Sequence, residues 1–221
     1  LSILGTEKQI GTSHVKLKNR LTIHPMEGFD GNEDGSPGEW TMRRCERFAE
    51  GGAGLIWLEA TAVVEEGRTS SSQLWLHDGT LDAFKALAER MHKLSNGTPL
   101  ILQLTHSGRF SRPHNLPAPV ISYHNPLMNE KMMVDPDYPV VTDEYLDTLP
   151  EKFGYAAKLA REAGFDGVDI KCCHKYLFSE LLSAYNRPGR YGGSLENRAR
   201  LFLDSVAAAS VWANDDFILA S

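Results

Sequence analysis

Short apolar runs alternate along the chain with longer segments in which apolar residues recur at helical spacing. Five runs are expected to form strands: Leu21–His24, Gly54–Leu58, Pro99–Leu104, Gly167–Ile170 and Phe217–Leu219. Four segments are expected to form helices: Gly38–Glu50, Leu81–Leu94, Asp143–Ala163 and Leu195–Trp212. Glycines follow two of these helices and favour their ends, at Gly51-Gly52 and at Gly164.

This order of elements predicts an α/β fold. A strand followed by a helix, repeated four times with a fifth strand begun, indicates βαβ units and a parallel sheet. A complete (β/α)8 barrel has about 250 residues, whereas the 221 residues here supply about four and a half units. We therefore expect an incomplete TIM (β/α)8-type barrel, preceded by a small hairpin within Ile3–Val15. It would form one domain over residues 1–221 that lacks the C-terminal strands.

The segment Ser107–Thr142 interrupts the alternation. Four prolines fall among its first twenty residues and it has little periodicity, which predicts an unusually long loop between a strand and the next helix. Loops of this length are usually functional.

Composition narrows the class of protein. The chain is 42% apolar and 24% charged, with a net charge of −6, which predicts a globular protein and argues against nucleic acid as a partner. We expect no membrane span and no signal peptide, because no apolar run is long enough and no basic segment precedes an apolar one at the start of the sequence, and the three cysteines form no disulfide pattern. These observations favour a cytoplasmic protein without membrane contact that could form a homo-oligomer. Helical charges such as Arg43, Arg44 and Glu46 are interpreted as solvated faces.

A polar cluster follows the fourth predicted strand. Side chains alternate along Val168–Lys171, so Asp169 and Lys171 share one face of the strand. Two inward charges are tolerated near the open carboxyl rim of a barrel, where water or a ligand meets them. His174 and Tyr176 follow directly, so the sequence predicts a site at this rim.

Six motifs occur in the order and at the spacing of a known family. They are Leu17–Leu21 (LKNRL), Pro25-Met26, Gly54–Ile56 with Glu59-Ala60, Gln103–Arg109 (QLTHSGR), Ala163–Ile170 (AGFDGVDI) and Tyr191–Arg198 (YGGSLENR). Through them the chain resembles the old yellow enzyme family of flavin-dependent oxidoreductases. The resemblance implies a TIM barrel that binds FMN at its C-terminal rim, takes electrons from NADH or NADPH and acts on a small-molecule substrate.

The resemblance also implies which residues contact the flavin. Pro25, Met26, Ala60 and Gln103 would line its isoalloxazine ring. The pyrimidine edge of that ring has one donor, N3, and two acceptors, O2 and O4, and a glutamine amide carries both kinds of group. Without the surrounding motif, a strand-end glutamine is more often a surface contact. Pro25-Met26 is also compatible with simple strand-end packing.

Three residues would perform the chemistry. The family usually has His at the position of Lys171 and His or Asn at that of His174, and the two bind the carbonyl oxygen of the substrate. Lys171 would instead place a cation near the developing oxyanion, with less directionality than an imidazole. Tyr176 matches the family's proton donor. This implies reduction of activated C=C bonds, such as those of enones, although a lone His or Tyr after a strand is more often structural.

Other positions depart from the family pattern. Glu27 stands where the family commonly has Thr or Cys close to flavin O4. An ionised carboxylate there would oppose the negative charge of reduced flavin, unless Glu27 is protonated or turns outward. The family's arginine against flavin N1 is replaced by Leu219 or Ala220. The later strands, whose loops hold the FMN phosphate in the family, are expected to be missing.

Two other functions are considered. In an aldolase-like barrel, Lys171 would form a Schiff base, but Asp169 on the same face would keep the lysine protonated. The other is a non-catalytic half-barrel or interaction module, which the missing phosphate site and the missing arginine suggest. No metal site is expected, because the eight histidines show no zinc spacing and the acidic run Asp30–Gly35 departs from a calcium loop.

Overall fold

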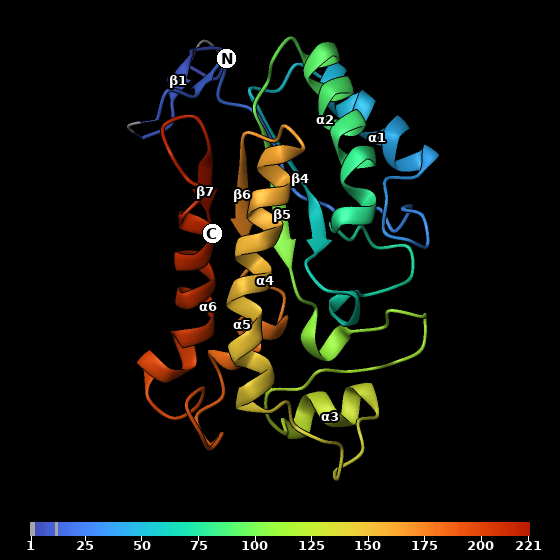
Figure 1. The fold of residues 1–221 in the computed structure, drawn as a ribbon, viewed down its shortest axis with the longest axis vertical. Coiled ribbons are helices and arrows are strands. Elements are labelled where there is room, and N and C mark those ends of the chain that lie inside the picture. The colour runs from blue at the N-terminus through green and yellow to red at the C-terminus, as the bar shows by residue number, and fades with distance from the viewer. Residues whose placement is uncertain (1–2, 12) are drawn as a thin grey trace.

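The computed structural model describes residues 3–11 and 13–221 and contains a five-stranded parallel sheet (Figure 1). The strands run in chain order across it: β3 (Thr22–Ile23), β4 (Leu55–Ala62), β5 (Leu100–Thr105), β6 (Gly167–Ile170) and β7 (Ile218–Ala220). All neighbouring pairs are parallel. The five predicted strands are therefore confirmed, with β4 extending four residues further than expected.

A small antiparallel hairpin precedes the sheet, as predicted. It pairs β1 (Lys8–Gln9) with β2 (Lys16–Leu17), so its second strand begins just beyond the predicted segment. Residue 12, within the predicted hairpin, lies outside the described residues, as do residues 1 and 2 of the predicted domain.

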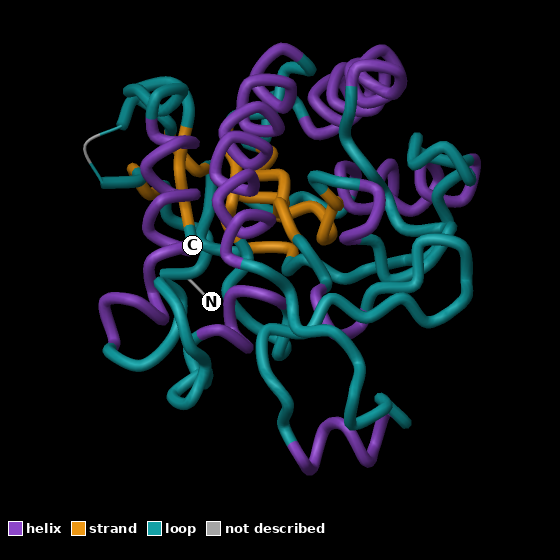
Figure 2. The backbone as a smooth tube through the Cα atoms, turned by 60° about the horizontal axis from the view of Figure 1, so that its bottom comes forward, coloured by secondary structure: helices purple, strands orange, loops and turns teal. Residues whose placement is uncertain are grey.

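The four predicted helices are present within about two residues of their expected ends. They are α1 (Glu39–Glu50), α2 (Leu81–Ser95), α4 (Asp143–Glu162) and α6 (Leu195–Ser210). Sequence patterns missed five short helical segments: α3 (Pro126–Met132), α5 (Leu177–Leu181), η1 (Glu65–Gly67), η2 (Asp78–Thr80) and η3 (Gly108–Phe110). The carboxyl ends of β4 and β5 point toward α3 and the long loop, at the bottom of Figure 1. Figure 2, in which this edge comes forward, shows the loops in front of the strands.

The two faces of the sheet carry different side chains. On the face that meets the helices, Val168 and Ile170 join a buried core with residues such as Leu102 and Phe153. On the other face, Asp169 is buried beside Gln103 of the neighbouring strand. The predicted division of β6 into an apolar and a polar face is confirmed.

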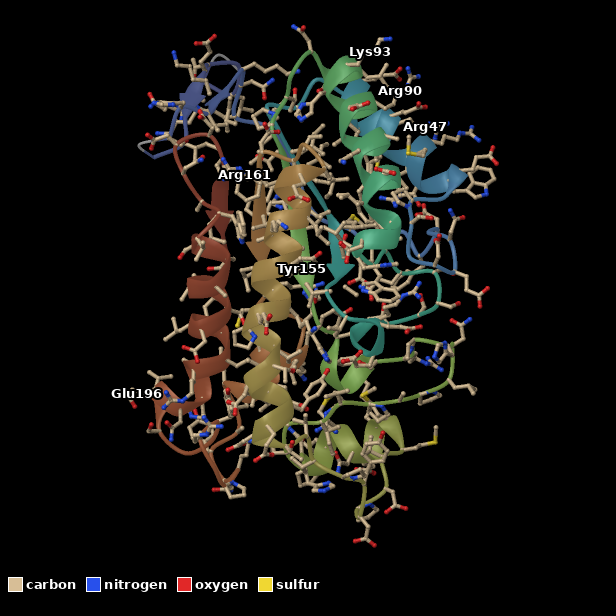
Figure 3. All side chains as sticks on the ribbon, in the orientation of Figure 1. Arg47, Arg90, Lys93, Tyr155, Arg161 and Glu196 are labelled. Atoms are coloured by element: carbon tan, nitrogen blue, oxygen red, sulfur yellow. The ribbon has the colours of Figure 1, made fainter. Side chains whose placement is uncertain are left out.

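The outward faces of α1 and α2 are charged. Arg47, Arg90 and Lys93 are exposed there (Figure 3), and Arg90 forms an ion pair of 2.7 Å with Glu46 of α1. The interpretation of Arg44 as part of this solvated face was wrong. Its side chain is largely buried and pairs with carboxylates under the helix, because the turn of α1 that holds Arg44 faces the loop after β3.

Two buried arginines hold the long loop in place. Arg109 pairs with Glu180 of α5, whose other oxygen accepts a hydrogen bond of 2.8 Å from the Ser122 backbone N–H. Arg187 donates to the carbonyl oxygens of Ser122 and Val141, at 2.7 Å each. The predicted long loop is therefore ordered over the carboxyl edge of the sheet. Within the described residues, no helix is both long and apolar enough to cross a membrane.

Candidate active site

A cavity of about 290 Å³ lies at the carboxyl ends of β3, β5 and β6. Seven of the eight predicted site residues line it, together with Phe29, which sequence reasoning missed. The seven are Pro25, Met26, Glu27, Gln103, Lys171, His174 and Tyr176. They come from segments up to about 150 positions apart in the chain, and the parallel sheet brings them together because its strands all end at the same edge.

Glu27 lies at the centre of the polar contacts in this cavity. Its Oε1 accepts hydrogen bonds of 3.1 Å from Lys171 Nζ and 3.1 Å from the Tyr176 hydroxyl. Lys171 Nζ also lies 4.4 Å from the centroid of the Tyr176 ring. The side chains of Lys171 and Glu27 are only 5% and 11% exposed, so water screens this ion pair weakly. Burial raises the pKa of the Tyr176 phenol above its ordinary value, and the Glu27 carboxylate raises that pKa further.

The orientation of Glu27 differs from the outward turn considered as one option from the sequence. The side chain does not turn outward, and its carboxylate faces a cation rather than standing alone. Glu27 and Lys171 are two of the positions at which the chain departs from the family pattern, and they contact each other directly. Each therefore supplies the charge that the other needs in order to be buried.

Buried and partly buried charged side chains fix the segment that carries Glu27. The backbone N–H of Gly28 donates to Glu59 Oε2 at 2.8 Å, and Arg44 pairs with both Glu59 and Asp30. A Cβ at Gly28 would come within 2.4 Å of the Arg44 guanidinium, which would then have to shift from its position against Asp30 and Glu59. The register of β4 with β5 shifts between Leu58 and Thr61, so Glu59 lies at a local irregularity of the strand.

Gln103 is oriented by two neighbours on the inner face of the sheet. Its Nε2 donates to Asp169 Oδ2 at 2.5 Å, and the Trp57 indole N–H donates to the same oxygen at 3.2 Å. Burial raises the pKa of Asp169, and the two hydrogen bonds act in the opposite direction. Because the amide N–H₂ faces Asp169, the carbonyl oxygen of Gln103 is left for a ligand. A flavin offers N3–H as a matching donor, so this residue fits the predicted cofactor.

The backbone after β6 adopts an unusual conformation. His174 and Lys175 have φ values of 59° and 56°, in the left-handed region that residues with a Cβ rarely occupy. Each such residue costs about 1 kcal/mol or more, and strain of this kind gathers at functional sites. The turn places both His174 and Tyr176 on the cavity, and His174 Nδ1 lies 3.0 Å from Cys173 Sγ.

Ala60 is the predicted flavin contact that the structure does not bring to this cavity. Its side chain is buried within β4, and its carbonyl oxygen accepts a hydrogen bond of 3.0 Å from Gln73 Nε2. A contact between Ala60 and a bound ring stays a prediction. Phe29 lies three residues after Met26, and this proximity was the one available signal. A single aromatic residue in a polar loop forms no distinct pattern, so the signal was too weak to predict its role.

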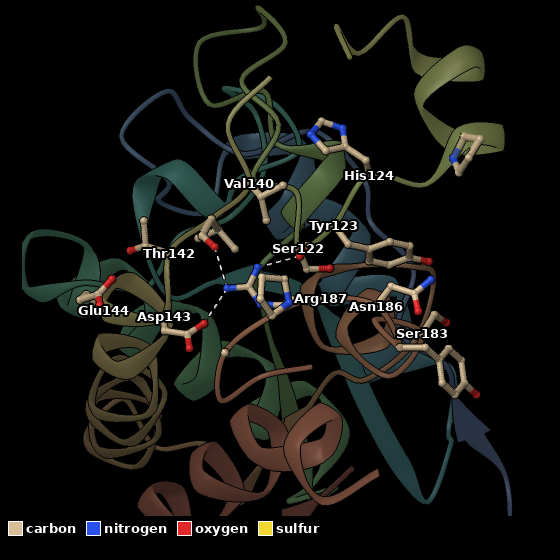
Figure 4. Close-up of a pocket in the computed structure, with 15 residues that line it drawn as sticks. Ser122, Tyr123, His124, Val140, Thr142, Asp143, Glu144, Ser183, Asn186 and Arg187 are labelled. Carbon is tan, nitrogen blue, oxygen red and sulfur yellow. Dashed lines mark hydrogen bonds and ion pairs between the residues drawn. The ribbon is translucent and has the colours of Figure 1, made fainter. Parts of the chain in front are cut away.

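A larger cavity of about 780 Å³ lies further out, between the long loop and the segment Ser183–Gly189 (Figure 4). None of the predicted site residues lines it. Its charged centre, Arg187, is already bound to two carbonyl oxygens and to Asp143 Oδ1 at 2.8 Å. We assign chemistry to the smaller cavity, because there the titratable side chains face one another.

His106, in the QLTHSGR motif, is buried and begins a chain of hydrogen bonds that leads to the exposed Glu66. Its Nδ1 accepts from the Gly108 backbone N–H at 3.0 Å, so its Nε2 carries the hydrogen and donates to the Tyr145 oxygen at 2.8 Å. The Tyr145 hydroxyl in turn donates to Glu66 Oε1 at 2.8 Å. Burial lowers the pKa of His106 to about 4. His106 is therefore a neutral structural residue that fixes the end of β5.

Comparison with known proteins gives one consistent family. A sequence model of the NADH:flavin oxidoreductase / NADH oxidase family matches residues 8–219. The NADPH dehydrogenase of Halalkalibacterium halodurans is 34% identical over 212 residues, which cover 94% of this chain and 60% of the relative. The NADPH dehydrogenase of Listeria monocytogenes serotype 4b is 35% identical over 204 residues, covering 90% of this chain and 58% of the relative.

Solved structures agree with these relatives. Old Yellow Enzyme from Pichia sp. AKU4542 superposes with a TM-score of 0.81 at 27% identity, covering 98% of this chain and 58% of that chain. The predicted fold, an incomplete TIM-type barrel, is thereby confirmed. The chain spans about 60% of the length of the curated relatives it matches.

The buried His106 predicts how stability depends on pH. The ordinary pKa of histidine is about 6.5, and the native value is about 4. Above pH 6.5 the imidazole of His106 is neutral in both the folded and the unfolded state. Between pH 6.5 and 4 the imidazole is protonated in the unfolded chain but stays neutral in the native state. The free energy of unfolding should therefore decrease as the pH is lowered from 6.5 to 4, by up to about 3 kcal/mol from this residue.

Urea unfolding of the whole protein at several pH values measures this effect. His106→Gln should flatten the pH dependence between pH 6.5 and 4, while His114→Gln, at an exposed position, serves as the control. An identical slope in His106→Gln and the wild type would contradict the assignment of a buried neutral imidazole.

Proposed function

The chain belongs to the NADH:flavin oxidoreductase / NADH oxidase family, and from this premise we propose that the whole protein is an FMN-dependent NAD(P)H oxidoreductase that reduces activated C=C bonds, such as those of enones. The observation that carries the proposal is the gathering of Lys171, His174 and Tyr176 around one cavity with Gln103. Three groups that can bind an oxyanion or give a proton thus face the place where a flavin ring would lie.

The same arrangement supports the proposed flavin contacts. Pro25, Met26 and Gln103 would hold the ring, with the carbonyl oxygen of Gln103 accepting from N3–H. When bound, FMN supplies the hydride that it takes from NADH or NADPH. Lys171 lies on the same cavity, where its positive charge can stabilise negative charge in a ligand.

The chain's own residues then divide the work on the substrate. Lys171 Nζ and His174 would bind the carbonyl oxygen of an enone, which becomes negative when hydride reaches the β-carbon. Tyr176 would give its hydroxyl proton to the α-carbon. The tilted contact between the rings of Phe110 and Tyr176, with centroids 5.7 Å apart, holds the phenol at the edge of the cavity.

The aldolase-like alternative receives less support. A Schiff-base lysine attacks through a free lone pair on its nitrogen, whereas Lys171 Nζ is ion-paired at 3.1 Å. The sequence argument against a Schiff base relied on Asp169 as the carboxylate beside Lys171. In the structure, the carboxylate that contacts Lys171 is Glu27. Asp169 instead accepts from Gln103 and Trp57.

The proposed function is tested by the colour and redox behaviour of the whole protein. Purified protein should show a flavin absorption spectrum, release FMN on denaturation, lose its visible absorbance when mixed anaerobically with NADPH or NADH, and regain it on addition of an enone. A colourless protein that does not bind added FMN would contradict the proposal and favour a non-catalytic half-barrel. Borohydride trapping of a substrate on Lys171 would instead favour the aldolase-like alternative.

Tyr176→Phe should separate the two half-reactions. The change removes one oxygen and keeps the packing of the ring. Reduction of the flavin by NADH or NADPH should therefore be nearly normal. Reoxidation by an enone should slow by about 10²- to 10⁴-fold, the usual contribution of a positioned acid. Quinones, which need no carbon protonation, should reoxidise the variant as fast as the wild type.

Stopped-flow absorbance measures both half-reactions, and Tyr185→Phe is the matched control, because Tyr185 is exposed and lies outside the cavity. Equal slowing with enones and quinones would point to a structural tyrosine. Full enone activity in Tyr176→Phe would show that another group gives the proton.

A further inference from the structure

We propose that Glu27 is a positioning residue that keeps Tyr176 in its proton-donating form by balancing the charge of Lys171. The inference rests on the proposed function, in which Tyr176 protonates the substrate. It assigns to Glu27 a role toward Tyr176 and Lys171, in addition to the flavin contact expected from the sequence.

The geometry provides the first argument. A single oxygen, Glu27 Oε1, lies 3.1 Å from Lys171 Nζ and 3.1 Å from the Tyr176 oxygen. A carboxylate oxygen can only accept, so both groups must donate to it. The phenol can occupy this arrangement only while it keeps its proton. The other oxygen of Glu27 has a weaker contact, 3.3 Å from Thr69 Oγ1.

The charges provide the second argument. An ammonium 4.4 Å from the centroid of a buried phenol favours the phenolate, and a phenolate has no proton to give. The Glu27 carboxylate opposes this effect from the other side. The remaining titratable groups near the phenol are Cys173 and His174, both on the segment after β6. Glu27 is therefore the carboxylate that faces Tyr176 and Lys171 together.

This pairing explains why a lysine can stand beside the proton donor. Without Glu27, the positive charge of Lys171 would stand unopposed beside the phenol and would lower the pKa of Tyr176. With Glu27, the pair is neutral overall and Tyr176 stays protonated. When a substrate oxygen enters the cavity, Lys171 has further N–H groups to offer it while keeping its bond to Glu27.

The test measures the ionisation of Tyr176 in protein freed of flavin, so that it does not depend on turnover. Tyrosines are labelled with ¹³C at Cζ, whose NMR shift reports phenol ionisation, and the Tyr176 signal is assigned by its loss in Tyr176→Phe. At pH 10, near the ordinary midpoint of a tyrosine, wild-type Tyr176 should be protonated. In Glu27→Gln, the ratio of ionised to protonated Tyr176 should rise at least about tenfold, since a nearby charge shifts a pKa by about one unit or more.

Two further variants sharpen the result. Glu27→Gln combined with Lys171→Met removes both charges and should return Tyr176 to the protonated form. Thr69→Val, which removes only the contact to the other oxygen of Glu27, should leave the signal as in the wild type. Glu27→Thr also removes the carboxylate and should behave as Glu27→Gln does, which covers the case in which the glutamine variant fails to fold.

A second readout uses the pH dependence of flavin reoxidation. Enone reoxidation in Glu27→Gln should decline at a lower pH than in the wild type, while quinone reoxidation should show no such change. An unchanged Tyr176 signal in folded Glu27→Gln or Glu27→Thr would overturn the proposal, even if enone activity fell. Failure of the whole protein to bind FMN would overturn the proposed function, and the NMR result would still decide the role of Glu27.

Discussion

The ion pair between Glu27 and Lys171 is the interaction on which the candidate active site depends. It joins the loop after β3 to the end of β6, and both side chains are almost completely removed from water. Neither charge could be buried alone, because an uncompensated buried ion costs several kcal/mol. The same carboxylate oxygen fixes the Tyr176 hydroxyl. One contact therefore sets the charge of the cavity and the direction of its proposed proton donor.

The rest of the fold keeps these side chains within reach of one another. Glu59, Arg44 and Asp30 form a buried ionic cluster that fixes the loop carrying Glu27. The left-handed turn at His174 and Lys175 directs the segment after β6 onto the cavity. The helices pack on the opposite face of the sheet, where Val168 and Ile170 enter the apolar core. In β6 the polar face is thus left for chemistry, and the apolar face supplies stability.

Much of this architecture could be predicted from the sequence, because periodicity and motifs are local signals. The alternation along Val168–Lys171 predicted which face each side chain takes, and the family motifs named seven of the cavity residues. The contacts that could not be predicted join residues that lie far apart in the chain. Nothing local shows that Lys171 pairs with Glu27, 144 positions away, rather than with Asp169 two positions away. Arg44 was misread for the same reason, since its carboxylate partner Glu59 lies on a strand whose register shifts at that point.

A double-mutant cycle on the free energy of unfolding tests the central claim most directly, namely that Glu27 and Lys171 act as one unit. It compares Glu27→Gln, Lys171→Met and the double variant of the whole protein by urea unfolding. If the two residues form a buried pair, each single variant leaves one charge unpaired, and the double variant should lose less stability than the sum of the single losses, by at least about 1 kcal/mol. Losses that simply add would contradict the account.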